Sequence, residues 1–213
     1  MSARSEILGR IRRATSGASP NRETDYASIP RRYIQESSLG HEETVDLFID
    51  RLHDYDAIVH RCDVAGISAT IAEVLSTRGK RGLLVPAELP SDWLPPNFTF
   101  VPDNSLSYNA IDRSEGVLTG CAVAIATTGT IVLRHSPADG RRALTLIPDF
   151  HLCVVPENRL VATVPEAIHV MSKFGSDPLT TVSGPSATSD IEMTRIKGVH
   201  GPRTLEVILV RER

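Results

Sequence analysis

The feature that most constrains the fold is a regular alternation of short apolar segments with helical patterns, which begins near residue 57. A short buried strand is predicted at 57–60, and apolar residues recur at helical spacing over 67–75. Two further short strands are predicted at 83–85 and 98–101, on either side of a proline-rich stretch. Strand, helix, strand, loop and strand in this order predict βαβ units around a parallel sheet. The predicted fold class is therefore α/β.

The second half of the chain adds a hairpin. Apolar strands at 121–126 and 131–133 are joined by a link so short that they must run antiparallel, with Gly129 at the position that requires a positive φ. The other predicted elements are strands at 152–155, 179–182 and 205–210, a helix entered through Pro165, and a helix that begins with the capping box Ser189 and Glu192 and ends at Gly198.

An N-terminal extension precedes the α/β region. Apolar residues over 7–14 recur at helical spacing, which predicts an amphipathic helix that packs on the body or on a partner. Residues 15–30 are rich in Ser, Pro and Arg and are typical of a linker. We therefore expect a helix and linker over 1–38 and one α/β domain over 39–213.

Composition excludes several classes of function. The formal net charge of −3 gives no overall attraction to nucleic acid or to an anionic membrane surface. Three cysteines without a C-x-x-C motif argue against an iron–sulfur cluster, a zinc site or another metal held by this chain alone, and against a disulfide framework. No apolar run reaches the length of a membrane span. We expect a cytoplasmic protein.

The strongest candidate ligand site follows the predicted strand at 179–182. Ser183, Gly184 and Ser186 are small polar residues that lead into the predicted helix, and Asp190 and Glu192 lie near its start. Backbone N–H groups and the helix dipole at such a junction favour an anion, a carboxylate or a phosphate. Ordinary helix capping without a ligand explains the same residues equally well, so the sequence does not decide between a ligand site and a helix cap.

Three other candidates have a structural explanation as well. Thr128, Gly129 and Thr130 present hydroxyl and N–H groups, but they also suit a plain tight hairpin. His151, which starts a predicted strand, is a weak candidate for a general base, because a histidine there is more often a hydrogen-bonded structural residue. Glu115 lies in a Ser-Glu-Gly stretch that weakly resembles the surroundings of the nucleophilic glutamate of coenzyme A transferases, although a solvated glutamate at a turn is the simpler reading.

The residues alone do not assign a reaction. Arg141 and Arg142 are able to clamp an acidic substrate, yet paired arginines on a loop are usually surface charge. The chain has no phosphate-binding P-loop, no Rossmann glycine fingerprint and no arrangement of nucleophile, base and orienting group that stands out. Whether the chain is an enzyme is left open at this point.

Three blocks of sequence resemble the lactate-utilisation protein C (LUD domain) family. The third block is the most specific, and the resemblance covers roughly residues 40–213. The blocks are Gly116–Cys121 with Thr128-Gly129-Thr130, Arg141–Leu144 with His151–Val155, and Ser183-Gly184-Pro185-Ser186 with Asp190-Ile191-Glu192 and Gly198–Pro202.

The resemblance implies a fold and a function. The family's domain is similar to the NagB/RpiA/coenzyme A transferase group, which has a Rossmann-like sheet with helices on both sides. Members act in the oxidation of L-lactate to pyruvate with two partners, LutA- and LutB-like proteins, one of which carries iron–sulfur clusters. Our first hypothesis is that the chain is a co-catalytic or non-catalytic component that by itself binds no cofactor. The alternatives are a stand-alone transferase or isomerase and a carboxylate-binding sensor.

The resemblance also selects positions expected to face a small carboxylate or phosphate ligand. Many members have an acidic residue directly before the Thr-Gly-Thr turn, where this chain has Thr127, so a step that needs that acid would be lost here. We expect the hairpin turn and the loop near residue 186 to share one pocket. The positions selected are Thr128, Gly129, Thr130, His151, Ser183, Gly184, Ser186, Asp190 and Glu192.

Overall fold

The computed structural model describes residues 3–15, 26, 28–188, 196–197 and 201–212. The chain forms two compact units, residues 1–34 and 35–213, so that the first unit ends slightly before the boundary expected from the sequence. The first unit contains helix α1 (Ala3–Thr15), none of whose residues is buried. The second unit contains all the sheets.

The centre of the second unit is a six-stranded sheet in which every neighbouring pair is parallel. The predicted α/β class with a parallel sheet is therefore confirmed. One strand of this sheet, β4, was not predicted, and the last strand of the chain inserts between two others. In spatial order the strands are β1 (Ile58–Asp63), β12 (Thr204–Arg211), β7 (Phe150–Pro156), β4 (Val117–Thr119), β2 (Gly82–Val85) and β3 (Thr99–Pro102).

A smaller sheet contains the predicted hairpin. Its strands β5 and β6 pair antiparallel, and Gly129 between them has φ 57°, as the short link requires. Strand β9 joins this sheet by pairing antiparallel with β6, rather than joining the large sheet. In spatial order the strands are β8 (Leu160–Val161), β5 (Val123–Ile125), β6 (Thr130–Arg134) and β9 (Leu179–Val182).

The helix predicted to end at Gly198 is wrong at its C-terminal end. Ile196–Lys197 form strand β11, which pairs antiparallel with β10 (Ala187–Thr188). The capping-box residues Ser189 and Glu192 lie outside the described residues. Because the strand partner is close in the chain, a local hairpin-like pairing replaces the helix at these two residues.

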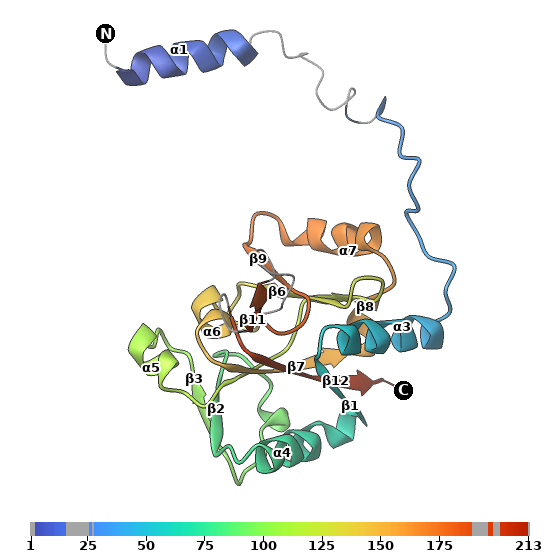
Figure 1. Ribbon diagram of the computed structural model, residues 1–213, viewed down its shortest axis with the longest axis vertical. Helices are drawn as coiled ribbons and strands as arrows, with labels where there is room; N and C mark the ends of the chain where they lie inside the picture. The colour runs from blue at the N-terminus through green and yellow to red at the C-terminus, as the bar shows by residue number, and fades with distance from the viewer. Residues whose placement is uncertain (1–2, 16–25, 27, 189–195, 198–200, 213) are drawn as a thin grey trace. The chain divides into compact units, whose positions relative to one another are not determined.

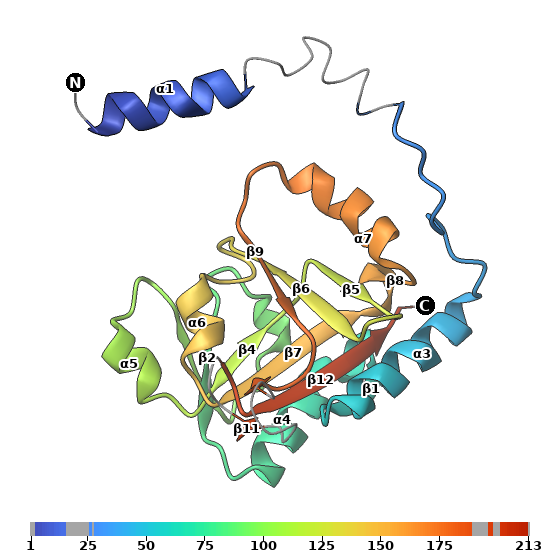
Figure 2. The same cartoon turned by 45° about the horizontal axis from the view of Figure 1, so that its top comes forward.

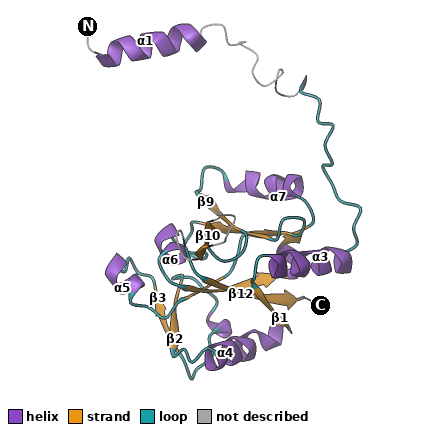
Figure 3. Cartoon of the chain, in the orientation of Figure 1, coloured by secondary structure: helices purple, strands orange, loops and turns teal. Residues whose placement is uncertain are grey.

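The large sheet is covered on both faces (Figures 1 and 3). Alternate residues of β7 point to opposite faces, so Leu152 and Val154 pack in the core beneath α4 (Ile67–Thr77), while Cys153 and Val155 pack beneath α3 (His41–Asp54) and the small sheet. In Figure 2, β4, β7, β12 and β1 run side by side. Helix α7 (Val164–Met171), entered through Pro165 as predicted, packs on β5 of the small sheet.

The order of connections places a topological switch between β2 and β4. The chain leaves β2 for the outer strand β3, then returns past β2 to β4 and continues in the opposite direction to β7. In open parallel sheets, ligands bind outside the carboxyl ends of the strands at such a point. The short helical segments are η1 (Val64–Gly66), η2 (Ser91–Trp93), α5 (Tyr108–Asp112), α6 (Arg142–Leu146), η3 (Glu157–Arg159) and η4 (Ser172–Phe174). Among the described residues, no helix has both the length and the apolar character needed to cross a bilayer.

Candidate functional site: a pocket at the carboxyl edge of the large sheet

The hairpin turn and the serine loop predicted to share a site are neighbours. The Thr130 hydroxyl lies 2.7 Å from the hydroxyl of Ser183 and 2.7 Å from that of Thr128. The Thr130 hydroxyl therefore bridges the hydroxyls of Thr128 and Ser183. The backbone N–H of Ser186 donates to the carbonyl of Pro202 at 2.8 Å.

The two glycines of this region are explained by close packing. A Cβ on Gly129 would lie 2.8 Å from Cβ of Arg51, and a Cβ on Gly184 would lie 2.4 Å from Cβ of Tyr55. Both glycines have a positive φ, 57° and 84°. They let the two loops approach the end of α3, just before β1 begins. The predicted site therefore lies towards the amino ends of the large sheet's strands. The sequence had instead predicted a site at the carboxyl end of a strand of the parallel sheet.

His151 and Glu115, the two candidates for catalysis, lie in different environments. His151 is 2% exposed, its Nε2 lies 2.8 Å from the Thr119 hydroxyl, and burial lowers its pKa to about 4. Glu115 accepts the Arg81 N–H at 2.6 Å, which lowers the pKa of that carboxyl, and it precedes β4 at the amino edge of the sheet. The histidine is a buried hydrogen-bonded group and the glutamate fastens a strand end. Asp190, like Glu192, lies outside the described residues.

A cavity of about 360 Å³ lies at the carboxyl ends of β2 and β3, next to the topological switch. Two residues in left-handed backbone conformations shape its wall, Ser105 with φ 64° and Gly140 with φ 88°. Such a conformation is costly for serine, and residues of this kind cluster at functional sites. The cavity is lined by Pro86, Ala87, Asp103, Asn104, Ser105, His135, Ser136, Pro137, Gly140 and Arg141.

Arg141 holds one side of this cavity in place. Its Nε and Nη2 donate to the Asp103 carboxylate at 2.7 and 3.0 Å, and Nη2 also donates to the carbonyl of Leu106 at 2.5 Å. The guanidinium hydrogen bond lowers the pKa of Asp103, which is nearly buried. Asp103 therefore balances the charge of the partly exposed Arg141, and the pair holds the loop after β3 in position.

Arg142 lies close enough to His135, which lines the same cavity, for its positive charge to act on that ring. Its guanidinium has no ion-pair partner among the described residues, although its residue is half-buried. Burial lowers the pKa of His135, and the nearby charge of Arg142 lowers it further. The Nε2 of His135 lies 2.8 Å from the Thr180 hydroxyl. A cation without a counter-charge beside a polar cavity favours binding of a small anion.

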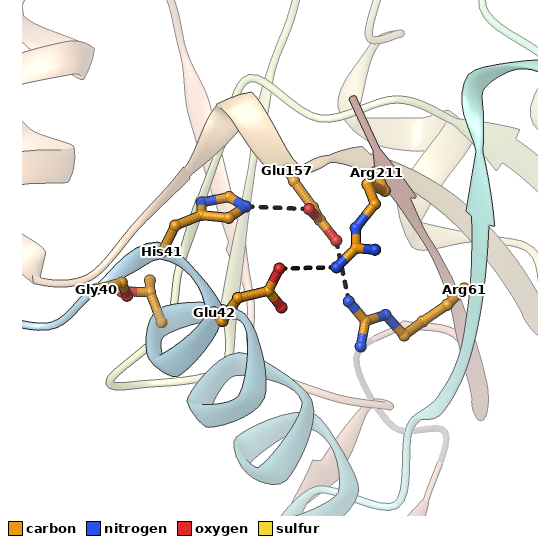
Figure 4. A network of polar contacts seen from close by, with 7 residues as sticks. Gly40, His41, Glu42, Arg61, Glu157 and Arg211 are labelled. Carbon is orange, nitrogen blue, oxygen red and sulfur yellow. Dashed lines mark hydrogen bonds and ion pairs between the residues drawn. The ribbon is translucent and has the colours of Figure 1, made fainter. Parts of the chain in front are cut away.

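A second polar group lies further along the carboxyl edge (Figure 4). The buried carboxylate of Glu157, at the end of β7, lies 3.1 Å from Nε2 of His41 and 3.4 Å from Nη2 of Arg61. Arg211, at the end of β12, donates to Glu42 at 2.7 Å. These contacts fasten the start of α3 to the ends of β7, β1 and β12. Because each arginine has a carboxylate partner, this group favours an anion less than the surroundings of Arg142.

Comparison with known proteins identifies the family. The LUD domain model matches residues 102–210. Lactate utilization protein C of Deinococcus radiodurans is 43% identical over 98% of this chain and 95% of its own length. The chain belongs to the LUD domain family. Lactate utilization protein C of Bacillus licheniformis is 26% identical over 98% of this chain and 93% of its own. A crystal structure of a DUF162 family protein from Deinococcus radiodurans is 42% identical, with a TM-score of 0.71 over 81% of this chain and 99% of that one.

The LUD domain match starts at the end of β3 and so includes Asp103, Arg141 and Arg142 together with the hairpin. Sequence reasoning considered the two arginines but missed Asp103 and His135. Asp103 directly follows a short predicted strand, and that position at a carboxyl end was the available signal. For His135 the sequence holds no comparable signal, because its neighbour Thr180 is 45 residues away.

The described residues of this LUD domain chain contain no group of three or more His, Cys, Asp or Glu side chains able to hold a metal ion. Cys121 and Cys153 are buried in the core, and burial raises the pKa of the Cys121 thiol to about 12. Thiols in that state are poor metal ligands, because a metal binds the thiolate.

Proposed function

We propose that this chain is a cytoplasmic component of a lactate-utilisation system. The support is its family, and in particular the full-length similarity to proteins called lactate utilization protein C. In this proposal, oxidation of L-lactate to pyruvate requires LutA- and LutB-like partners, and the iron–sulfur clusters belong to a partner. The chain acts as a co-catalytic or ligand-binding component.

The ligand we propose is a small monocarboxylate such as lactate or pyruvate, bound in the cavity next to the topological switch. The observation that carries this assignment is the Arg142 guanidinium, which acts on His135 in the cavity wall and has no ion-pair partner among the described residues. A bidentate contact from a guanidinium suits a carboxylate, and His135 and Ser136 offer further polar groups in the cavity wall. A volume of about 360 Å³ is ample for a three-carbon acid.

The hairpin turn and serine loop remain a second proposed anion site. The Thr130 hydroxyl already bonds to those of Thr128 and Ser183, so an anion there would have to replace these two bonds. At the cavity beside Arg142, by contrast, no internal ion pair has to be broken. We therefore expect the first site to bind a carboxylate more strongly than the second.

Titration calorimetry of the full chain with L-lactate, pyruvate and acetate tests the assignment. Arg142→Gln should weaken binding by at least about tenfold, because a charged hydrogen bond contributes roughly 1.5–3 kcal/mol. The matched control is Arg81→Gln, since the Arg81 side chain is 94% exposed at the opposite edge of the sheet. Equal affinities of the wild type and Arg142→Gln would refute the site. Loss of binding only in Ser183→Ala would move the site to the serine loop.

Reconstitution tests the proposed role. Lactate-dependent dye reduction should require the chain together with both partner proteins and should be absent with the chain alone. Full activity of the isolated chain would contradict a component role and support a stand-alone enzyme. In cells, deletion of the chain should abolish growth on L-lactate, and the wild-type chain should restore it. Normal growth of the deletion strain would refute the role.

A further inference from the structure

His135 is a titratable side chain in the wall of the cavity next to the topological switch. It directly follows β6, and its backbone N–H donates to the carbonyl of Pro178 at 2.9 Å. Its Nε2 lies 2.8 Å from the hydroxyl of Thr180 on β9, the strand that pairs with β6 (Figure 2). The imidazole therefore has a fixed position where the small sheet meets the cavity.

The contact with Thr180 is compatible with a neutral and with a charged imidazole. A hydroxyl group both donates and accepts hydrogen bonds, so Thr180 can donate to a bare Nε2 or accept from a protonated one. Among the described residues, the other ring nitrogen, Nδ1, has no hydrogen-bond partner. Protonation of His135 therefore keeps the protein's own contact and leaves Nδ1 with an N–H to donate to a further partner.

Four of the charged groups on the segments around His135 form two ion pairs. Arg134, the preceding residue on β6, donates from Nε to the Asp177 carboxylate at 2.6 Å. In the cavity wall, Arg141 donates from Nε to the Asp103 carboxylate at 2.7 Å. Because each of these pairs has no net charge, neither strongly favours one protonation state of the ring over the other.

Three further charged groups lie on neighbouring segments. Asp139, in the loop that follows, is buried, and burial raises the pKa of its carboxyl. The exposed Glu88 is tied to that loop, because its backbone N–H donates to the carbonyl of Pro137 at 3.0 Å. The pKa of His135 is lowered first by burial and second by the positive charge of Arg142, at the start of α6. The ring therefore experiences a neighbouring positive charge.

Burial and the charge of Arg142 both oppose a second positive charge on the ring, and a bound anion offsets that opposition. We propose that a carboxylate enters this cavity together with one proton, which His135 accepts, so that a guanidinium and an imidazolium hold the anion. This inference rests on the carboxylate site proposed above and adds its coupling to pH. By linkage, the ligand favours the protonated ring by the same factor as the protonated ring favours the ligand.

The direction of the pH dependence follows from the two states of the ring. In the ligand-free protein the pKa of His135 lies below its ordinary value of 6.5, so the ring is neutral at pH 7. In the complex, the nearby carboxylate raises that pKa. The ligand itself stays ionised throughout, because a carboxylic acid of this kind titrates near pH 4 or below. Between the two pKa values of the ring, the affinity therefore rises by up to about tenfold for each unit by which the pH falls.

Titration calorimetry of the full chain with L-lactate at pH 8, 7 and 6 tests the coupling. The affinity should rise by about fivefold or more from pH 8 to pH 6, and the binding enthalpies at pH 7 in phosphate and in Tris should differ because the buffer supplies the proton. His135→Gln should remove both effects, whereas His53→Gln, a change of an exposed histidine on α3, should keep them. An affinity independent of pH, or proton uptake that persists in His135→Gln, would overturn the coupling.

A measurement without ligand tests the same groups and does not depend on the folding of His135→Gln. In an NMR titration of the His135 ring, Arg142→Gln should raise the pKa towards 6.5, because the neighbouring positive charge is lost, and Arg81→Gln at the opposite edge of the sheet should leave it unchanged. The same pKa in Arg142→Gln and the wild type would contradict the proposal. A wild type that binds no carboxylate would refute the site and the coupling together, whereas binding without proton uptake would refute the coupling alone.

Discussion

The buried histidine His151 makes stability depend on pH in a defined window. Its Nε2 is bonded to the Thr119 hydroxyl at 2.8 Å inside the core, and burial lowers its pKa from 6.5 to about 4. In the unfolded chain the ring takes up a proton near pH 6.5, whereas in the folded protein it resists protonation until about pH 4. Its contribution to stability is therefore complete above pH 6.5 and is lost as the pH falls towards 4.

The size of the loss follows from linkage. Between these two pKa values the free energy of unfolding falls by about 1.4 kcal/mol per pH unit, which amounts to about 2 kcal/mol at pH 5 and about 3 kcal/mol once the folded protein also protonates. The variant His151→Gln keeps a hydrogen-bonding side chain but does not titrate. It is expected to be less stable than the wild type at pH 7 and to lose less stability on acidification.

Urea unfolding followed by circular dichroism at pH 7, 6, 5 and 4.5 measures this difference. The difference in unfolding free energy between wild type and variant should shrink by about 2 kcal/mol from pH 7 to pH 5. Comparing the two proteins cancels the titration of the other histidines. Parallel pH profiles would show that His151 is not a buried neutral ring and would reopen its assignment as a general base.

Two further predictions concern the hairpin region, both measured by chemical unfolding. Thr130→Val and Ser183→Ala should show a coupling energy of about 0.5–1.5 kcal/mol in a double-mutant cycle, because their hydroxyls bond at 2.7 Å; additive effects would contradict that contact. Gly129→Ala should destabilise the protein more than Gly79→Ala. Both glycines have a positive φ, but a Cβ on Gly129 would lie 2.8 Å from Arg51, whereas a Cβ on Gly79 would face open space. Equal losses of stability would leave backbone strain as the only cause.

Features that depend on short stretches of chain were predictable. The strand at 83–85, the hairpin around Gly129 and the helix entered through Pro165 follow from apolar periodicity and from the conformations that glycine and proline adopt. The prediction of a helix up to Gly198 was wrong at its C-terminal end. A capping pattern indicates only a local preference, and the pairing of Ile196–Lys197 with β10 overrides that preference.

The candidate site was less predictable, because its members are joined only by tertiary structure. The pair Arg141 and Arg142 was visible in the sequence. The sequence did not show that Asp103 balances the charge of Arg141, or that Arg142 lies near His135. The hydroxyls of Thr130 and Ser183 were expected to be close, and they are, yet the strand that brings Ser183 there belongs to the small sheet.

The sequence by itself determined the class of fold. The alternating strand and helix periodicities, of two and 3.6 residues, are recognised from residues close together in the chain and do not depend on distant contacts. Only the tertiary structure decided that β12 lies between β1 and β7, and hence which loops gather at the carboxyl edge. Strand order is set by the packing of side chains far apart in the chain, such as Cys153 and Val207. That order, rather than any local motif, brings Arg142, which has no ion-pair partner among the described residues, near His135 in the cavity wall.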